Sequence, residues 1–160
     1  MDQQALYVQM ALTNWDHQTQ RAEKILWGFS DAEFQLTVAP GRNRVIYICG
    51  HLITVHDRLF ELLGLGKRLH PEFDALFRTN PDGAVEDLPG PEHLKACWKE
   101  VHEQLHTDFL RLPAAAWFDR HMDVSPEDFA KEPHRNRLMV LMSRTAHAAW
   151  HAGQLVLARR

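Results

Sequence analysis

The sequence predicts an all-α fold, a four-helix bundle with a long crossover between its second and third helices. Strand signals are nearly absent, because no stretch sustains the two-residue alternation of a half-buried strand and no Asn-Gly hairpin turn occurs. Four segments, each longer than twenty residues, instead repeat apolar residues at the three- and four-residue spacing of helices. Clusters of proline, glycine and asparagine separate these segments.

The first predicted helix covers residues 3–29. Its apolar stripe consists of Val8, Leu12, Trp15, Thr19, Ala22, Leu26 and Phe29. His17 points away from this stripe and is expected to be solvated. Ser30 and Glu33 then form a capping-box pattern, which predicts a short helical turn before Pro40.

The second predicted helix covers residues 44–65 and ends at Gly64 and Gly66. Residues 67–90 contain many prolines, glycines and other turn formers, so they are expected to be irregular except for a helical turn at 73–77. This segment is the predicted crossover.

The third and fourth long helices are predicted at residues 91–112 and 136–159. The third carries the seam of a bundle helix, formed by Leu94, Trp98, Val101, Leu105, Phe109 and Leu112. Ser125, Pro126 and Glu127 predict the start of a short helix before Pro133. The fourth long helix is apolar nearly all round, which favours burial on two sides, and we expect a homodimer formed through it.

Composition narrows the class of protein. The 160 residues suit one domain, residues 1–160, and 45% hydrophobic with 24% charged residues is ordinary for a folded chain. A net charge of −3 without a basic run argues against a nucleic-acid partner. We find neither a signal peptide nor an apolar stretch long enough to span a membrane, so we expect a cytoplasmic protein without a membrane partner. Cys49 and Cys97 are expected to be buried free thiols.

Histidine is over-represented, with 11 copies, and it is the side chain most used for metal binding and proton transfer near neutral pH. His147 and His151 lie four residues apart on the fourth helix, so both rings project from one face and can meet one metal ion. Small residues flank the pair and are expected to leave room beside the rings: Ala146, Ala148, Ala149, Ala152 and Gly153. A histidine pair on a helix surface or in a subunit contact remains the alternative.

A third ligand has to come from another helix. On the second helix, His51 shares an apolar row with Tyr47 and Val55, whereas His56 lies about 140° away, so one ion cannot take both. His51 is the better candidate, although a core histidine with an ordinary hydrogen-bond partner would fit the same position. Arg58 falls near the face of His51, where an anion contact or an ion pair would suit it.

A second pair with the same spacing, His102 and His106, lies beside charged residues on the third helix and is expected to be solvated. Glu103 and His106 form a single Glu-x-x-His element. Dinuclear carboxylate sites need two such elements, so a dinuclear site is not expected. His70, His93, His121 and His134 lie in or beside loops, and no pattern distinguishes them.

Two motifs resemble the DinB-like (DinB/YfiT) superfamily: Tyr-Ile-Cys-Gly-His-Leu-Ile at 47–53 and His-Ala-Ala-Trp-His-Ala-Gly-Gln-Leu at 147–155. The likeness extends to Asn14 and Trp15 and to the Phe-Ser-Asp-Ala-Glu turn at 29–33. The resemblance implies a four-helix bundle with a long crossover and one divalent metal ion, most often nickel or zinc, with manganese or iron as further options. His51, His147 and His151 match the family's three metal-binding histidines. Ala152 stands where the family often has an arginine, so a role of that arginine in substrate or subunit contacts is not carried over to this chain, while the three metal-ligand positions are unaffected.

The superfamily includes transferases and isomerases that use bacillithiol or mycothiol. Three imidazoles leave an open coordination position, typical of a catalytic site, where a thiol can be held as thiolate or water activated. The sequence therefore predicts metal-dependent thiol S-transfer between a low-molecular-weight thiol and a small electrophile, or metal-assisted hydrolysis. The alternative is a non-catalytic dimeric module that binds a metal or a small ligand. The pattern identifies no catalytic general base and no site for an organic cofactor.

Overall fold

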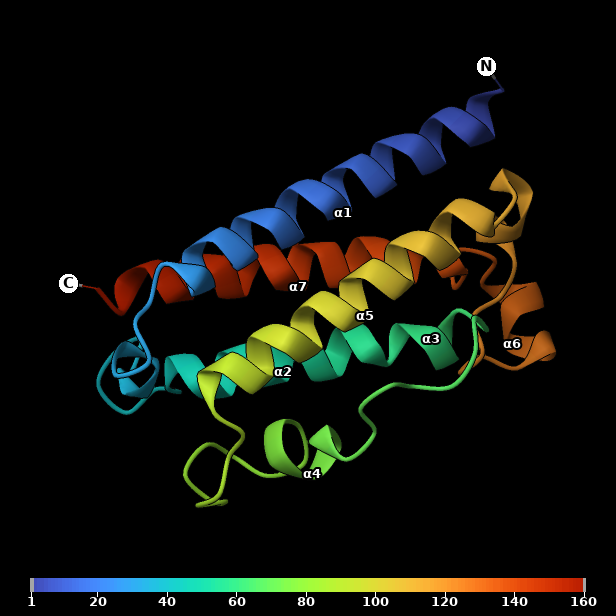
Figure 1. The fold of residues 1–160 in the computed structure, drawn as a ribbon. Coiled ribbons are helices and arrows are strands. Elements are labelled where there is room, and N and C mark those ends of the chain that lie inside the picture. Colours follow the sequence, from blue (N-terminus) through green and yellow to red (C-terminus); the bar gives the residue numbers. More distant parts are fainter. Residues whose placement is uncertain (1, 160) are drawn as a thin grey trace.

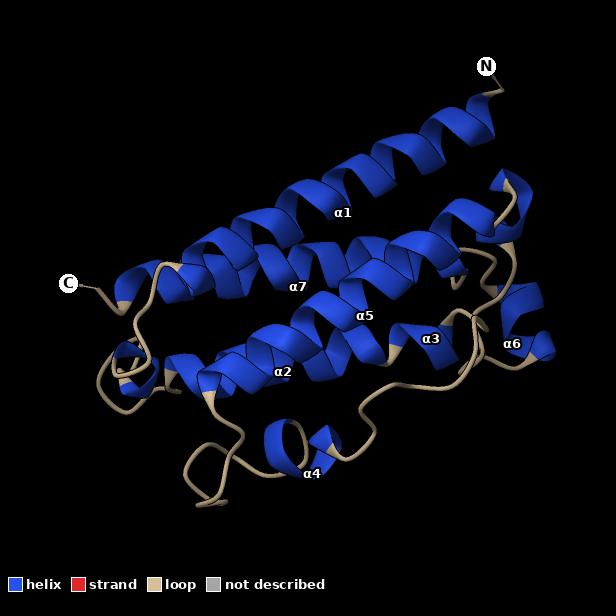
Figure 2. Ribbon diagram, in the orientation of Figure 1, coloured by secondary structure: helices blue, strands red, loops and turns tan. Residues whose placement is uncertain are grey.

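A computed structural model describes residues 2–159, and this part of the chain is all-α (Figures 1 and 2). The elements follow in the order α1 (Gln3–Trp27), η1 (Glu33–Gln35), α2 (Val45–Asp57), α3 (Leu59–Leu62), α4 (Phe73–Phe77), α5 (Pro91–Arg111), η2 (Ala114–Phe118), α6 (Pro126–Lys131) and α7 (Arg137–Leu157). No helix within residues 2–159 is both long enough and apolar enough to cross a membrane.

The four long helices lie beside one another (Figure 1). Helix α1 packs along α7, α2 packs against both α5 and α7, and α4 covers the outer side of α2. Nearly all of α2 is buried by these neighbours, which explains its apolar sequence. Large side chains such as Trp98, Trp117 and Phe60 fill the interior. Because α2 and α7 are in contact, side chains from both can meet between them.

Local signals in the sequence agree with the ends of several helices, short and long. The Ser30 backbone N–H donates to Glu33 Oε2 at 2.7 Å, and the Glu33 N–H donates back to Ser30 Oγ at 3.4 Å, which completes the predicted capping box. Ser125 caps α6, and Asn136 caps α7 by accepting from the Met139 N–H. Gly64 adopts a φ of 66°, the left-handed conformation expected where a helix stops at glycine.

The second predicted helix is not continuous, because it is interrupted at Arg58 between α2 and α3. The interruption covers one residue, and the Arg58 N–H still donates to the Thr54 carbonyl. Just before it, the fully buried Asp57 carboxylate accepts hydrogen bonds from the backbone N–H groups of Leu69 and His70 and from Arg68 Nε. Asp57 therefore fastens the start of the 67–90 segment to α2.

The far end of the 67–90 segment is fastened to the opposite end of α2. Asp82 accepts from the Arg44 backbone N–H at 2.7 Å and pairs with the Arg44 guanidinium. The Tyr47 hydroxyl donates to the Asn80 carbonyl at 2.6 Å. These contacts hold the irregular segment and α4 against α2, although the segment has little regular structure of its own.

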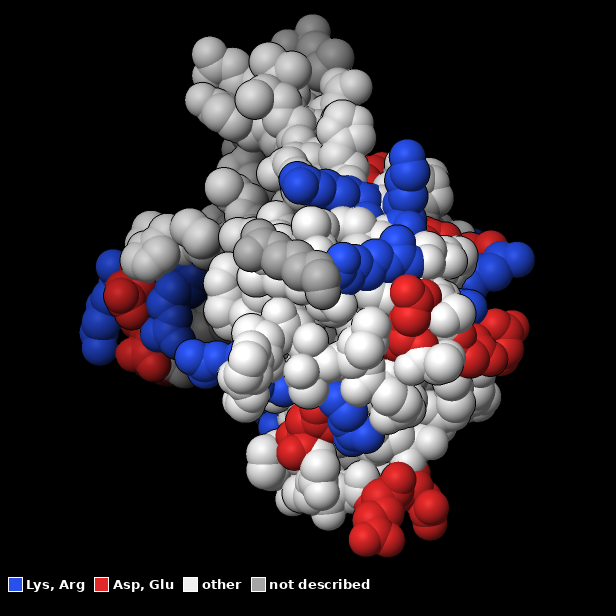
Figure 3. Space-filling model, turned by 90° about the vertical axis from the view of Figure 1, so that its left-hand side faces the viewer, with Lys and Arg blue, Asp and Glu red and all other residues white. Residues whose placement is uncertain are grey.

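Charge is interspersed on the face drawn in Figure 3, where Lys and Arg side chains stand among Asp and Glu side chains. That face presents no broad basic patch of the kind that neutralises a row of phosphates.

Candidate metal centre

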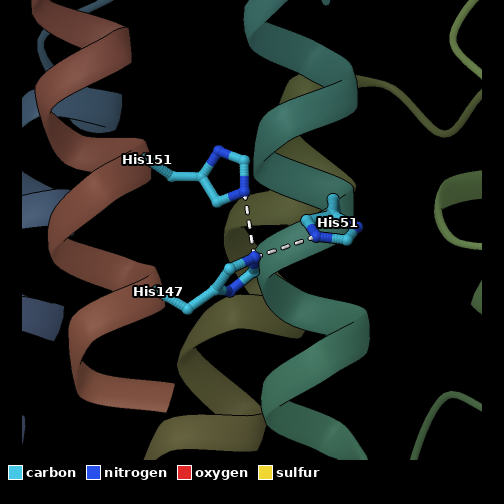
Figure 4. A group of neighbouring side chains, drawn as sticks. All are labelled: His51, His147 and His151. Atoms are coloured by element: carbon cyan, nitrogen blue, oxygen red, sulfur yellow. Dashed lines mark hydrogen bonds between the residues drawn. The ribbon is translucent and has the colours of Figure 1, made fainter. Parts of the chain in front are cut away.

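Three histidines from two helices converge between α2 and α7 (Figure 4). His147 Nε2 lies 3.3 Å from His51 Nε2 and 3.1 Å from His151 Nε2, so His147 is central. One ring nitrogen from each residue lies within 4.8 Å of the other two, a spacing that can hold one metal ion. The structure thus brings together all three histidines singled out in the sequence.

The outer nitrogens of two rings are already engaged. His51 Nδ1 lies 2.8 Å from the Phe77 carbonyl, and His151 Nδ1 lies 2.8 Å from Gln154 Oε1. Both oxygens are acceptors, so each Nδ1 carries the proton and each Nε2 presents a lone pair to the centre. Hydrogen bonds of this kind fix the tautomer and orientation of metal-binding imidazoles. The donor set therefore fits a divalent ion.

Burial keeps the three imidazoles neutral at physiological pH. Desolvation lowers the pKa of His147 and of His151 to about 4, and it also lowers the pKa of His51. The positive charge of Arg144 adds to the effect on His51 and His147. Neutral imidazole is the form that binds metal, so these ligands need not lose a proton at neutral pH.

The three rings open into a cavity of about 360 Å³. Aromatic and basic side chains share its wall with Gln154: Tyr47, Trp150, Arg42 and Arg78. No carboxylate among the described residues lines this cavity. The small residues around His147 and His151 do not line it either, contrary to expectation, because Ala148 and Ala152 face the core while Ala146 and Gly153 face outward.

Two supporting groups could not be picked out from the sequence. The Phe77 carbonyl is a backbone atom from the irregular segment, and its role depends on how α4 docks onto α2. For Gln154 the sequence offers one signal: it follows His151 by three residues on the same helix, and this spacing places its amide next to the ring of His151. Each group accepts a hydrogen bond from one ring of the three-histidine group and so holds the orientation of that ring.

Gly50 on α2 allows α4 to pack closely against α2, because a β-carbon at this position would overlap the ring of Phe77 on α4. We expect Gly50→Ala to destabilise the protein by about 1–3 kcal/mol through overpacking and to weaken metal binding, since the Phe77 carbonyl would shift from His51. Gly153→Ala, also within a helix, meets nothing within 4 Å and is the matched control. Urea unfolding and chelator competition test both, and equal behaviour of the two variants would contradict the role of Gly50.

The prediction that His102 and His106 are both solvated holds for His106 only. His106 is exposed, but His102 turns inward, with Nε2 3.0 Å from His56 Nδ1 and Nδ1 2.8 Å from the Trp98 carbonyl. The rings of Trp15 and Trp98 pack against these two histidines. The expectation of a solvated His102 is wrong because its hydrogen-bond partner lies on another helix, where the pattern of a single helix cannot reveal it.

Burial of His102 predicts acid sensitivity. Desolvation lowers its pKa to about 4 in the folded protein, against 6.5 for an unperturbed histidine, so between these values the unfolded chain binds more protons. Stability should therefore fall as pH drops from 6.5 towards 4, by up to about 1.4 kcal/mol per pH unit from this residue. Urea titrations of metal-free protein across this range should show a shallower loss for His102→Gln. An equally steep loss would count against this explanation.

Other residues fall outside the centre. The Arg58 guanidinium lies 3.9 Å from the Asp74 carboxylate and 4.0 Å from the Asp123 carboxylate. Of the two roles considered for Arg58, an anion contact or an ion pair, the structure shows the ion pair. Cys49 and Cys97 are buried free cysteines, as expected, and burial raises the pKa of both thiols, that of Cys97 to about 11. Neither thiol is therefore suited to act as a nucleophile.

Comparison with known proteins supports the fold. No family model and no curated protein matches the chain. Among solved structures, the chain is similar to the crystal structure of a conserved protein from Enterococcus faecalis, with a TM-score of 0.64 and 19% sequence identity. The similarity covers 100% of this chain and 96% of the other. At this identity the likeness shows a shared all-α fold.

Proposed function

We propose that the protein is a metal-dependent enzyme of the DinB-like superfamily that transfers a low-molecular-weight thiol to a small electrophile. The observation that carries the proposal is the convergence of three neutral imidazoles at the wall of an open cavity. Three protein ligands leave at least one position of a zinc-like ion free for a reactant, as in catalytic rather than structural sites. Nickel, zinc and iron all suit an all-imidazole donor set, and we propose nickel or zinc as the ion; manganese, which prefers carboxylate and water oxygens, is less well matched.

We also propose that the fold is a DinB-like four-helix bundle. Its four helices are α1, α2, α5 and α7, and residues 67–90 are its long crossover. Two observations support this. The four helices pack side by side, and the three histidines lie on α2 and α7, the helices that carry the two family-like motifs.

The cavity favours thiol transfer over hydrolysis. A metal ion at the three histidines would hold the thiol as thiolate, the nucleophilic form. Arg42 and Arg78 line the cavity and favour an anion, while no described carboxylate lines it to act as a base towards water. In the reaction, the sulfur forms a bond to the electrophilic carbon, the leaving group departs with its electron pair, and the thiol proton passes to solvent.

The test uses purified protein loaded with nickel, zinc or manganese, a bacterial thiol such as bacillithiol or mycothiol, and monochlorobimane as electrophile. We expect faster conjugation with the parent protein and a loss of this acceleration in His147→Ala. Cys49→Ala and Cys97→Ala should retain activity, since neither buried thiol takes part. Failure of every metal and thiol combination to accelerate conjugation would refute thiol transfer.

The second candidate function is a non-catalytic dimeric module that binds a metal or a small ligand. The surface of α7 supports the association of two copies of the chain. One heptad-spaced row on α7 is buried: Leu138, Leu141, Thr145, Ala148, Ala152 and Leu155. A second row, one residue further along, is uncharged and mostly exposed: Met139, Met142, Ala146, Ala149, Gly153 and Val156. A three- and four-residue repeat of this kind is the seam of a helix pair. We therefore propose that two copies of the chain associate through this second row, whether or not the protein is an enzyme.

The dimer is tested by light scattering coupled to size exclusion. Ala146→Glu places a charge in the middle of the second row, and like charges would then meet across a two-fold axis, so we expect a monomer. Leu110→Glu, on an exposed position of α5, is the control and should leave the dimer intact. A monomeric parent protein at micromolar concentration would exclude the dimer.

Metal exchange separates the two candidate functions. A structural metal should resist chelators, and its removal should lower the melting temperature strongly. A catalytic metal should exchange with modest loss of stability. The metal-free and metal-loaded forms can be compared in one thermal-unfolding series.

A further inference from the structure

A second cavity, of about 530 Å³, lies between α7 and the segment of residues 119–136 that precedes it. This segment carries α6, at the same end of the molecule as α3 (Figure 1). The Met122 N–H donates to the Leu62 carbonyl at 2.9 Å, and the Arg137 N–H donates to the Asp119 carbonyl at 3.0 Å. These hydrogen bonds hold the segment against α3 and against the first turn of α7. The cavity shares no lining residue with the one beside the three histidines.

The side chain of Arg144, on α7, lines this cavity and is half-buried. Its Nε is buried and has no hydrogen-bond partner among the described residues. Within residues 2–159 no carboxylate lies at ion-pair distance from its guanidinium; burial and the charge of Arg58 both lower the pKa of Arg144. Arginine nevertheless stays protonated at neutral pH, and a charge removed from water without a partner is costly.

The other charged side chains of the cavity already have partners. Arg135 lies 3.2 Å from Glu132, and Arg58 lies 4.0 Å from Asp123, so both carboxylates that line the cavity are paired. Arg58 also belongs to a network of three arginines and three aspartates whose charges cancel: Arg58, Arg68, Arg78, Asp57, Asp74 and Asp123. Among the charged residues that line the cavity, Arg144 therefore carries the unbalanced charge.

Further donors line the same cavity. The Asp123 backbone N–H donates to His121 Nδ1 at 3.3 Å, so the neutral His121 ring carries its proton on Nε2. Burial lowers the pKa of His121, which keeps this ring neutral at pH 7. Ser143 contributes a hydroxyl, while Leu62 and Val140 contribute apolar surface. The cavity thus offers one ligand a guanidinium, two further donors and an apolar wall.

We propose that this cavity binds a small organic carboxylate, whose anionic group pairs with Arg144. The planar guanidinium can donate two parallel hydrogen bonds to such a group, and His121 can donate a third. One unbalanced positive charge matches one carboxylate, whereas a doubly charged phosphate would also be repelled by Asp123 and Glu132. The hydrocarbon part of the ligand lies against the apolar wall. This site goes beyond the proposed function and needs no metal ion.

The binding test titrates the whole protein with isobutyrate, a carboxylate with a short apolar group. Nitrogen NMR follows the backbone N–H signals of residues 140–144 and the Arg144 Nε–H signal. We expect saturable shifts, because the buried Nε–H gains an acceptor, and none with the uncharged isobutyramide. Arg144→Met should lower the affinity for isobutyrate about 10–100-fold, since hydrogen bonds to a charged group are lost. Arg42→Met, in the cavity beside the three histidines, is the matched control and should bind isobutyrate like the parent protein.

Thermal unfolding gives a second readout that does not depend on binding. Without ligand, Arg144→Met should melt no lower than the parent protein, because the substitution removes an unbalanced charge and keeps an apolar stem. Isobutyrate should raise the melting temperature of the parent protein but not that of Arg144→Met. A clearly lower melting temperature of ligand-free Arg144→Met would mean that the guanidinium has a partner within the protein, and would overturn the proposal.

Two binding results would also count against the site. If isobutyrate shifts neither the signals of residues 140–144 nor the melting temperature, the cavity binds no carboxylate of this size. If inorganic phosphate binds more tightly than isobutyrate, the ligand class is wrong.

Discussion

Replacing His147 with alanine is expected to lower the affinity for nickel or zinc by about a hundredfold or more. His147 Nε2 is the nitrogen that lies within 3.3 Å of both other ligand nitrogens, so its loss leaves one histidine on each of two helices. Zinc sites with several ligands bind with about 10–16 kcal/mol in total, so one ligand contributes on the order of 3 kcal/mol. Elemental analysis of the purified protein and chelator competition measure the effect.

His106→Ala is the matched control for this substitution. His106 belongs to the other HxxxH pair and is exposed on α5, so its removal should change neither metal content nor affinity. Equal metal content and affinity in His147→Ala and the parent protein would contradict the three-histidine centre.

The grouping of the three histidines could largely be predicted from the sequence because helical geometry is regular. A spacing of four residues places His147 and His151 on one face whatever surrounds them. The rotation of 100° per residue likewise separates His51 from His56 on the other helix. The prediction that His51 meets His147 and His151 came from the family resemblance, because no local rule gives the face of α2 that contacts α7.

The surroundings of the ligands were less predictable because they depend on tertiary contacts. The carbonyl that orients His51 comes from Phe77, and it reaches the site only because Gly50 lets α4 dock closely. His102 was misplaced for the same reason, since its partners are reached across helices. Capping at Ser30 and Ser125 depends on neighbours in sequence and was predictable.

Removing the carboxylate of Asp57 is expected to cause the largest loss of stability. The Asp57 side chain is fully buried and accepts from two backbone N–H groups and from Arg68 Nε, at 2.7, 3.2 and 2.9 Å. The Arg68 side chain is itself only 6% exposed. Asp57→Ala leaves this guanidinium with only Asp74 and leaves two N–H groups unpaired, and breaking a buried pair in this way costs about 3–5 kcal/mol. Urea unfolding of the metal-free protein measures the change.

Asp123→Ala is the comparison, because Asp123 is 63% exposed and lies 4.0 Å from Arg58. An exposed ion pair contributes about 0–1 kcal/mol, so this variant should unfold nearly like the parent protein. Asp57 also fastens the segment that carries Phe77, whose carbonyl accepts from His51. Asp57→Ala should therefore weaken metal binding although it touches no ligand, whereas Asp123→Ala should not. A stable Asp57→Ala protein with parental metal affinity would mean that α4 is held to α2 by apolar packing and the contacts of Arg44 and Tyr47 alone.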